Sequence, residues 1–282
     1  MALFQTTFFS QCLFRYVQVN VLIPCDDFGA GRGSAERREY KTLYLLHGYA
    51  GDRMDWIMSG DANQTSQMFD IAIVMPSGDN SFYTDNPYLS HNYGAFISRE
   101  LVDYTRRIFP LSPAPEDTYI GGLSMGGYGA LYNALRHSDV FGHAIVLSAP
   151  TIGVGENATD EPDKMGSTRG YFDAVLGADR AGGQSDSDLC YLADRVHRTG
   201  GDCADLYIAC GYNDMLVRGN RKYHRFLTEL GVPHFYEEGP GTHEWSFWRE
   251  YLRRGLARSI EPRDFDGKNN PLWIERDEEE VM

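Results

Sequence analysis

The feature that most restricts the fold is the alternation of short apolar runs with amphipathic stretches. Continuous apolar runs are typical of strands that are buried on both faces of a parallel sheet. Amphipathic stretches between such runs are typical of the helices that connect parallel strands. The sequence therefore predicts an α/β fold with a mostly parallel central sheet and helices on both faces. We expect strands over residues 16–23, 42–46, 71–75, 118–121, 144–148, 206–210 and 234–238, and helices over 96–109, 127–135, 218–230 and 244–257.

Two segments depart from this alternation. A length of 282 residues would allow two domains, but residues 151–201, which are rich in Gly, Asp and Ser, fall between two expected strands. We interpret them as an inserted cap with short helices. The C-terminal residues, from about 275 to 282, are strongly charged, and we expect them to be mobile. The sequence thus predicts a single domain over 1–282, and its sheet is expected to begin with antiparallel strands.

Composition excludes several classes of protein. The 40 acidic and 26 basic residues give a net charge of −14, which argues against nucleic-acid or anionic-membrane partners. No apolar run approaches the roughly 20 residues that span a bilayer, and the N-terminus does not have the pattern of a signal peptide. The five cysteines are odd in number and lack metal-site spacing. We therefore expect reduced thiols, a cytoplasmic location and no metal.

The strongest motif is Gly122-Leu-Ser-Met-Gly126. An expected strand enters it and an expected helix leaves it, which is the context of a nucleophile elbow. Side chains at the two glycine positions would collide with neighbouring chain, and Ser124 would adopt a strained backbone conformation. A phosphate-binding turn or a simple tight turn is the alternative, but the P-loop lysine and the G-x-G-x-x-G pattern are both missing. The motif therefore predicts that Ser124 is a nucleophile.

A serine nucleophile needs a base, and in α/β-hydrolases the chain order is Ser, acid, His. His243 lies in a loop after an expected strand, at the carboxyl edge of the sheet. Asp214 is the acid in the loop after the preceding strand, where it would orient His243 and stabilise the imidazolium. Capping of the next helix is the alternative role for Asp214. We interpret His197 as a residue of the insertion that no strand end holds in place. The other histidines after Ser124 are interpreted as surface or packed residues: His137, His143, His224 and His234.

Acyl transfer also needs hydrogen-bond donors for the oxygen that becomes negative. One expected donor is the backbone N–H of Met125, directly after the nucleophile. The other is the backbone N–H of Tyr49, in the loop after the strand at 42–46. The His47 side chain competes as a catalytic candidate, but it precedes the nucleophile in the chain. We interpret His47 as a hydrogen-bonding residue that shapes this loop.

These motifs resemble a family of esterases within the α/β-hydrolases. The family includes tributyrin, feruloyl and acetyl-xylan esterases, S-formylglutathione hydrolases of the esterase D type, and mycolyltransferases. The resemblance spans roughly residues 40–250 and implies the same triad and the same oxyanion donors. It rests on Leu45-Leu-His-Gly48 with Gly51 and Trp56, Val74-Met-Pro76, Ser81-Phe-Tyr-Thr-Asp85, Ile120-Gly-Gly-Leu-Ser-Met-Gly-Gly-Tyr-Gly-Ala130, Cys210-Gly-x-x-Asp214 and Tyr236-Glu-Glu-Gly-Pro-Gly-Thr-His-Glu-Trp-x-x-Trp248.

The resemblance is closest to the tributyrin esterase branch. Tyr49-Ala-Gly51 stands where esterase D-like hydrolases carry Leu-Thr-Cys, which weakens the S-formylglutathione interpretation. We expect a serine carboxylesterase that needs no cofactor and acts on small esters with short acyl or aryl groups, such as acetyl, butyryl or feruloyl. The alternatives are an S-formylglutathione hydrolase or acyltransferase and a non-catalytic binding protein on the same fold. The resemblance also implies homo-oligomers, although the sequence has no stripe of surface residues that indicates an oligomer interface.

Three aromatic residues are candidates for the lining of the substrate pocket. They are Trp56, Tyr83 and Trp245, and each flanks a loop at the carboxyl side of the expected sheet. Ordinary aromatic packing in the core is the alternative interpretation for all three.

Overall fold

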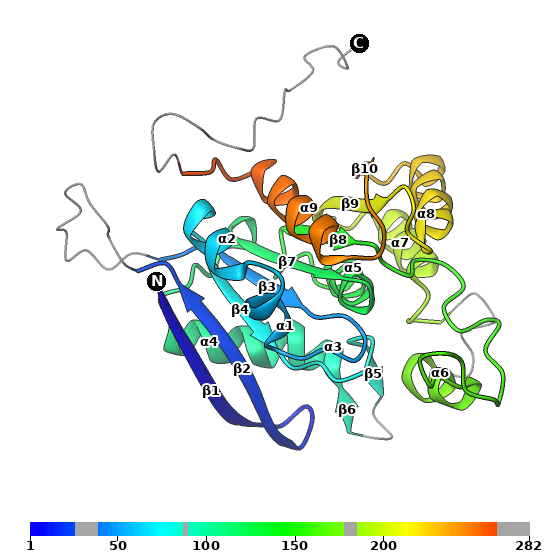
Figure 1. Ribbon diagram of the computed structural model, residues 1–282, viewed down its shortest axis with the longest axis horizontal. Helices are drawn as coiled ribbons and strands as arrows, with labels where there is room; N and C mark the ends of the chain where they lie inside the picture. Colours follow the sequence, from blue (N-terminus) through cyan, green and yellow to red (C-terminus); the bar gives the residue numbers. More distant parts are fainter. Residues whose placement is uncertain (26–38, 87–89, 178–184, 264–282) are drawn as a thin grey trace, which may run out of the picture.

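The computed structural model of the chain describes residues 1–25, 39–86, 90–177 and 185–263 (Figure 1). Within this part, eight strands form one sheet in the order β1-β2-β4-β3-β7-β8-β9-β10. Neighbours from β4 to β10 are parallel, whereas β1 and β2 add an antiparallel edge. This is the mostly parallel sheet with an antiparallel start that the sequence predicts. The strands are β1 (Ala2–Ser10), β2 (Arg15–Ile23), β3 (Thr42–Leu46), β4 (Ala72–Pro76), β7 (Thr118–Leu123), β8 (His143–Leu147), β9 (Asp205–Gly211) and β10 (Phe235–Gly239), with a separate hairpin of β5 (Asp85–Asn86) and β6 (His91–Asn92).

The central strands are buried on both faces, as their continuous apolar runs predict. Because successive side chains of a strand point to opposite faces, Leu43 and Leu45 of β3 join one core cluster, and Tyr44 and Leu46 join the other. All four side chains are almost completely covered. Each face of the sheet therefore needs its own layer of helices.

Helices supply those two layers (Figure 1). The cluster that includes Tyr44 and Leu46 contains residues of α4, α5, α7 and α8. The cluster that includes Leu43 and Leu45 contains residues of α1, α2 and α9. The expected helix over 96–109 begins as a π-helical segment, Phe96–Glu100, before it becomes α4. The helices are α1 (Asp55–Met58), α2 (Ala62–Phe69), α3 (Tyr93–Ala95), α4 (Leu101–Ile108), α5 (Met125–Arg136), α6 (Arg169–Leu176), α7 (Leu189–Thr199), α8 (Val217–Leu230) and α9 (Trp245–Ala257), with a 3₁₀ turn at Pro115–Asp117.

The described part of the segment after β8, which leaves out residues 178–184, contains the helices α6 and α7. Helix α6 is joined to the loop that follows β4: Tyr171 donates a hydrogen bond to the Asn80 carbonyl (2.6 Å), and Thr84 donates one to the Val175 carbonyl (2.7 Å). The charged tail over 275–282 lies outside the described residues. Among the helices that the structure describes, none is long and apolar enough to cross a membrane.

Candidate active site

Ser124 lies at the turn between β7 and α5. Ser124 has φ +52° and ψ −120°, a left-handed conformation that non-glycine residues rarely adopt and that costs about 1–3 kcal/mol. Its N–H donates a hydrogen bond to the Leu147 carbonyl of the next strand (2.8 Å). The surrounding structure therefore holds a strained serine at the carboxyl edge of the sheet.

The glycines on both sides of Ser124 are required by close backbone contacts. A Cβ atom on Gly122 would lie 2.5 Å from the Gly126 carbonyl carbon, and one on Gly126 would lie 2.4 Å from the Leu46 oxygen. Neither neighbour is the end of a flexible side chain, so any larger residue would displace the backbone. The steric reason that the sequence analysis gives for the two glycines is therefore confirmed.

His243 and Asp214 meet at the ends of β10 and β9. The Nδ1 atom of His243 lies 2.9 Å from the Oδ2 atom of Asp214. The carboxylate is completely covered, whereas about a fifth of the His243 side chain is exposed. Asp214 Oδ1 also accepts the N–H of Leu216 at the start of the next helix (2.8 Å). Asp214 therefore has both of the roles that the sequence analysis considers: Oδ2 binds the histidine, and Oδ1 accepts an N–H at the start of the helix.

Asp214 remains ionised despite its burial. Burial by itself would raise the pKa of this carboxyl, but the hydrogen bonds from His243 and from the Leu216 N–H, with help from the Ser148 hydroxyl, hold the pKa below its ordinary value. Ser148 is itself left-handed, at φ +47°, and its Oγ accepts the indole N–H of Trp248 (3.1 Å). The Trp248 ring packs edge-to-face against the His243 ring at 4.9 Å. Trp248 therefore supports both members of the pair.

The loop after β3 approaches the serine closely. A Cβ atom on Gly48 would lie 2.6 Å from Leu123 Cδ1 and 3.6 Å from the Cβ of Ser124. The Gly48 carbonyl accepts hydrogen bonds from His47 Nδ1 (2.7 Å) and from the Gly51 N–H (3.2 Å). In a trans peptide the N–H points opposite to the C=O. The N–H of Tyr49, which belongs to the same peptide unit, therefore points away from those two donors.

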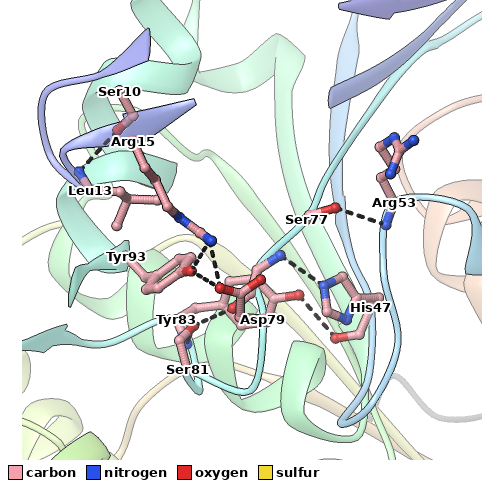
Figure 2. A network of polar contacts seen from close by, with 11 residues as sticks. Ser10, Leu13, Arg15, His47, Arg53, Ser77, Asp79, Ser81, Tyr83 and Tyr93 are labelled. Atoms are coloured by element: carbon pink, nitrogen blue, oxygen red, sulfur yellow. Dashed lines mark hydrogen bonds and ion pairs between the residues drawn. The ribbon is translucent and has the colours of Figure 1, made fainter. Parts of the chain in front are cut away.

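His47 is locked in one neutral tautomer. The Gly78 N–H donates to His47 Nε2 (2.8 Å), so the ring proton resides on Nδ1, and burial lowers the pKa of His47. The Tyr83 hydroxyl donates to the His47 carbonyl (3.0 Å). Figure 2 shows these contacts beside a second group in which Arg15 and the Tyr93 hydroxyl bind Asp79. The loop after β4 thus holds His47 from both sides, which agrees with its interpretation as a shaping residue.

Ser124 and His243 line one cleft of about 550 Å³, together with Tyr49 and Met125. Met125 opens helix α5, where an N–H group has no acceptor within the helix. The remaining walls are largely apolar, and they come from the loops after β4, β8 and β9 and from α6 and α8. They include Phe82, Ala149, Pro150, Thr151, Ile152, Gly153, Val154, Gly155, Asp163, Met165, Ser167, Phe172, Met215, Leu216 and Gly219.

The three aromatic residues expected in the pocket do not line this cleft. Trp56 and Tyr83 are buried, and their polar atoms donate to the carbonyls of Leu46 and His47. Trp245 packs edge-to-face on Trp56 at 5.2 Å. Their assignment to the substrate pocket is therefore corrected to aromatic packing, the alternative interpretation, because Trp56 and Tyr83 turn inward to carbonyls at the end of β3 and just after it, and Trp245 packs against Trp56.

The sequence analysis missed the residues that do form the walls. Phe82 belongs to the Ser81–Asp85 motif, where both Phe82 and Tyr83 have positive φ. The direction of the Phe82 side chain depends on this backbone conformation, which the motif alone does not reveal. Met215 follows Asp214 directly, so its position was a usable signal. Phe172 lies on α6, inside the segment interpreted as a cap, and no pattern distinguishes it from Tyr171.

Of the other histidines, His224 and His234 bind each other through Nδ1 and Nε2 (2.8 Å).

Comparison with known proteins places this geometry in a class. The chain is 36% identical to an acetyl esterase of Caldicellulosiruptor saccharolyticus over 255 residues, which cover 89% of this chain and 96% of that protein. Among solved structures it resembles FphF, a fluorophosphonate-binding serine hydrolase of Staphylococcus aureus, with a TM-score of 0.81, 28% identity and coverage of 92% and 98%. It also resembles FrmB, an S-formylglutathione hydrolase of the same organism, with a TM-score of 0.78, 28% identity and the same coverage.

The fold and these relatives define a serine ester hydrolase of the α/β-hydrolase fold. Residues 10–259 match the model of the family described as "Putative esterase". The chain belongs to that esterase family, as its motifs suggest.

Proposed function

We propose that the chain is a serine carboxylesterase in which Ser124, His243 and Asp214 form the catalytic triad and short-chain acyl or aryl esters are the substrates. The observation that carries the proposal is the 2.9 Å contact between His243 and Asp214 in the same cleft as the strained Ser124. A binding protein would have no need of a buried, ionised partner for a histidine at that point.

Acylation begins when the Ser124 hydroxyl oxygen attacks the carbonyl carbon of the ester and His243 Nε2 accepts its proton. Asp214 holds the Nδ1 proton of His243, so Nε2 is the free acceptor, and its negative charge stabilises the imidazolium that forms. The N–H groups of Tyr49 and Met125 hold the tetrahedral oxygen. His243 then gives its proton to the departing alcohol, and the acyl group remains on Ser124.

Deacylation repeats these steps with water. His243 removes a proton from the water molecule, which attacks the acyl carbon, and the tetrahedral oxygen is held by the same two donors. The carbon–oxygen bond to Ser124 breaks, and His243 returns the proton to the serine oxygen. The products are the free carboxylic acid and the regenerated enzyme.

The test is to compare the native chain with the Ser124→Ala and Ser59→Ala variants on p-nitrophenyl acetate and butyrate. Ser59 lies at the end of α1 and does not line the cleft, so it serves as a matched control. We expect Ser124→Ala to lose hydrolysis and labelling by a fluorophosphonate probe, while Ser59→Ala keeps both. Full activity of Ser124→Ala would refute the proposal, and failure of the native chain to react with the probe would favour a binding protein.

A second candidate is hydrolysis of S-formylglutathione, which the similarity to FrmB favours. Attack on a thioester uses the same triad, so only the substrate distinguishes the two. A panel of acetyl, butyryl and feruloyl esters and S-formylglutathione, compared by kcat/KM, separates them, and acceptor alcohols added to the same panel would reveal acyl transfer. A preference for the carboxylic esters supports our first proposal.

The remaining expectations concern organisation. We propose that the chain is a single domain in which the segment over 151–201 acts as a cap, supported by the contribution of this segment to the cleft walls. Homo-oligomers and a cytoplasmic location are further expectations, which light scattering and cell fractionation would test.

A further inference from the structure

Strand β1 forms one edge of the central sheet (Figure 1). It pairs with β2 over all nine of its residues, and in the described part of the chain no strand pairs with its other side. A long free edge presents backbone N–H and C=O groups to other chains, and proteins usually protect such edges with lysine, proline or a bulge. The sequence of β1, ALFQTTFFS, has no charged residue and no proline, and its register with β2 is unbroken. This edge is therefore open to a further strand.

Exposed apolar side chains gather at the same edge. Of the twelve large apolar side chains that are exposed in the described part of the chain, five lie within residues 3–16. They are Leu3, Phe4, Phe9, Phe14 and Tyr16, and the last two are each 73% exposed. Phe9 packs edge-to-face on Phe14 (5.6 Å between ring centres) and on Tyr16 (5.4 Å). A concentration of this kind indicates an interaction surface, whereas single exposed apolar residues do not.

The side chains of β1 alternate between the two faces of the sheet. Phe8 stacks on Tyr104 of α4 (3.8 Å between ring centres), and the Thr6 hydroxyl lies 2.8 Å from the Tyr104 hydroxyl. Gln5 contacts Met54, which precedes α1, through its amide nitrogen. The even-numbered residues of β1 therefore point toward α4, and the odd-numbered residues point toward the opposite layer.

The chemical character of β1 is symmetrical about Thr6. Residues at equal distances on either side of it match on each face of the sheet. The pairs are Gln5 and Thr7, which are polar, and Phe4 with Phe8 and Leu3 with Phe9, which are apolar. If two copies of β1 lay antiparallel about a two-fold axis at Thr6, each of these residues would lie directly opposite its match. A shift of the axis by one residue would place apolar residues opposite threonine or glutamine, so the pattern specifies one register.

The exposed side chains have about the area that a dimer requires. At about 200 Å² for one aromatic side chain, the exposed parts of Phe4, Phe9, Phe14 and Tyr16 offer about 450 Å² in each copy and about 900 Å² in a pair. Leu3 and the backbone of β1 add to this area. Specific interfaces bury about 1,200–2,000 Å² in total, so the edge alone supplies most of the surface that a stable pair needs.

We propose that β1 is the interface of a homodimer, in which the β1 strands of two copies pair antiparallel about a two-fold axis at Thr6 and join their sheets into one. An interface with two-fold symmetry uses the same patch on both copies, so that patch must be self-complementary, as β1 is. Pairing also gives partners to the free backbone groups of the edge. The inference is independent of the proposed function, because no residue of β1 lines the cleft.

The experiment is sedimentation equilibrium of the full chain over a range of concentrations. We expect the native chain to have twice the mass of one copy at high concentration and to dissociate reversibly on dilution. Two double variants at Gln5 and Thr7, which are both exposed, test the register. Gln5→Lys with Thr7→Lys sets lysine opposite lysine at two points and should raise the Kd of the dimer by at least about tenfold. Gln5→Glu with Thr7→Lys sets opposite charges there and should keep the native Kd or lower it.

A matched control adds charge elsewhere. Thr199→Lys with Thr228→Lys introduces the same two charges at exposed positions of α7 and α8, whose hydroxyl groups bind carbonyls of their own helices. This variant should keep the native Kd. Thermal unfolding of each variant reports its folding. If the lysine pair on β1 prevents folding, Leu3→Gln, which removes the apolar partner of Phe9, takes its place and should also weaken the dimer.

Each outcome decides the question. A dimer that is weakened by the lysine pair on β1 and kept by the glutamate–lysine pair and the control supports the inference. A native chain that sediments as a single copy at every concentration overturns it, as does a dimer that survives the lysine pair or is weakened equally by both β1 variants. A single copy that binds phosphatidylcholine vesicles would assign the apolar edge to lipid and also overturn it. Failure of the proposed function looks different, since ester hydrolysis would then be missing whatever the mass.

Discussion

His47 allows a test of how the proposed oxyanion donor is oriented. Its Nδ1 proton binds the Gly48 carbonyl, whose peptide unit carries the Tyr49 N–H, and its Nε2 accepts the Gly78 N–H. Replacing His47 by asparagine or by glutamine tests these two contacts one at a time. The amide nitrogen of asparagine can take the place of Nδ1, and the amide oxygen of glutamine can take the place of Nε2. His47→Asn should therefore preserve the contact to Gly48, whereas His47→Gln should preserve the contact to Gly78.

The expected magnitudes differ between the two variants. Loss of one oxyanion donor typically lowers kcat by about 10²- to 10³-fold, and we expect a loss of this order in His47→Gln, with little change in KM. In His47→Asn the unpaired Gly78 N–H costs about 1–3 kcal/mol of stability, but the orientation of the Tyr49 N–H is kept. Its kcat should remain within about tenfold of the native value, the equivalent of one net hydrogen bond.

The assay is steady-state hydrolysis of p-nitrophenyl butyrate, with thermal unfolding of each variant as the control for folding. Both variants lose one buried hydrogen bond, so similar unfolding temperatures are expected. Equal losses of kcat in the two variants, or a smaller loss in His47→Gln, would refute the argument that His47 orients the Tyr49 N–H through the Gly48 carbonyl.

Three further variants test the geometry of the site. Gly126→Ala places a Cβ atom 2.4 Å from the Leu46 oxygen, so the elbow must shift, and p-nitrophenyl butyrate hydrolysis should fall by at least about 10²-fold, the scale of one lost oxyanion donor. Asp214→Asn should lower kcat by about 10⁴-fold. The pKa of Asp214 in the folded protein is below its unfolded value. Its ionised form therefore stabilises the protein above about pH 4, and this effect is lost as the pH falls through the folded pKa. In Asp214→Asn, the free energy of unfolding by urea should accordingly depend less on pH in the acidic range. Trp248→Phe keeps a ring against His243 but removes the indole donor to Ser148, and kcat should fall about two- to tenfold, while an unchanged kcat would show that this donor has no role.

The central sheet could be predicted from sequence because its strands are continuous apolar runs with both faces covered. Strand β1 was not predicted, since Gln5, Thr6 and Thr7 interrupt its apolar residues and its edge position exposes several side chains. Helix α2 was also missed, because its sequence, ANQTSQMF, has little apolar periodicity. Its position is set by packing against the sheet, which local patterns do not encode.

The positions of Ser124, Asp214 and His243 could be predicted because parallel strands bring their carboxyl ends to one edge, so chain order and loop position suffice. The cleft walls could not be predicted in this way. Trp56 and Tyr83 follow strands, as pocket residues do, but the direction of each ring depends on which carbonyl its polar atom reaches. That choice is made by the folded loop and not by the spacing of residues along the chain.

The outer part of the cleft has a consequence for how such an enzyme can diversify. Ile152, Met165 and Met215 line it, yet all three are exposed and lie in loops outside the strands of the sheet. Exchanges at exposed positions usually change stability by no more than about 0.5 kcal/mol. Mutations at these positions can therefore accumulate without threatening the folded state, and selection can redirect the enzyme to new esters while the elbow and the His243–Asp214 pair stay the same.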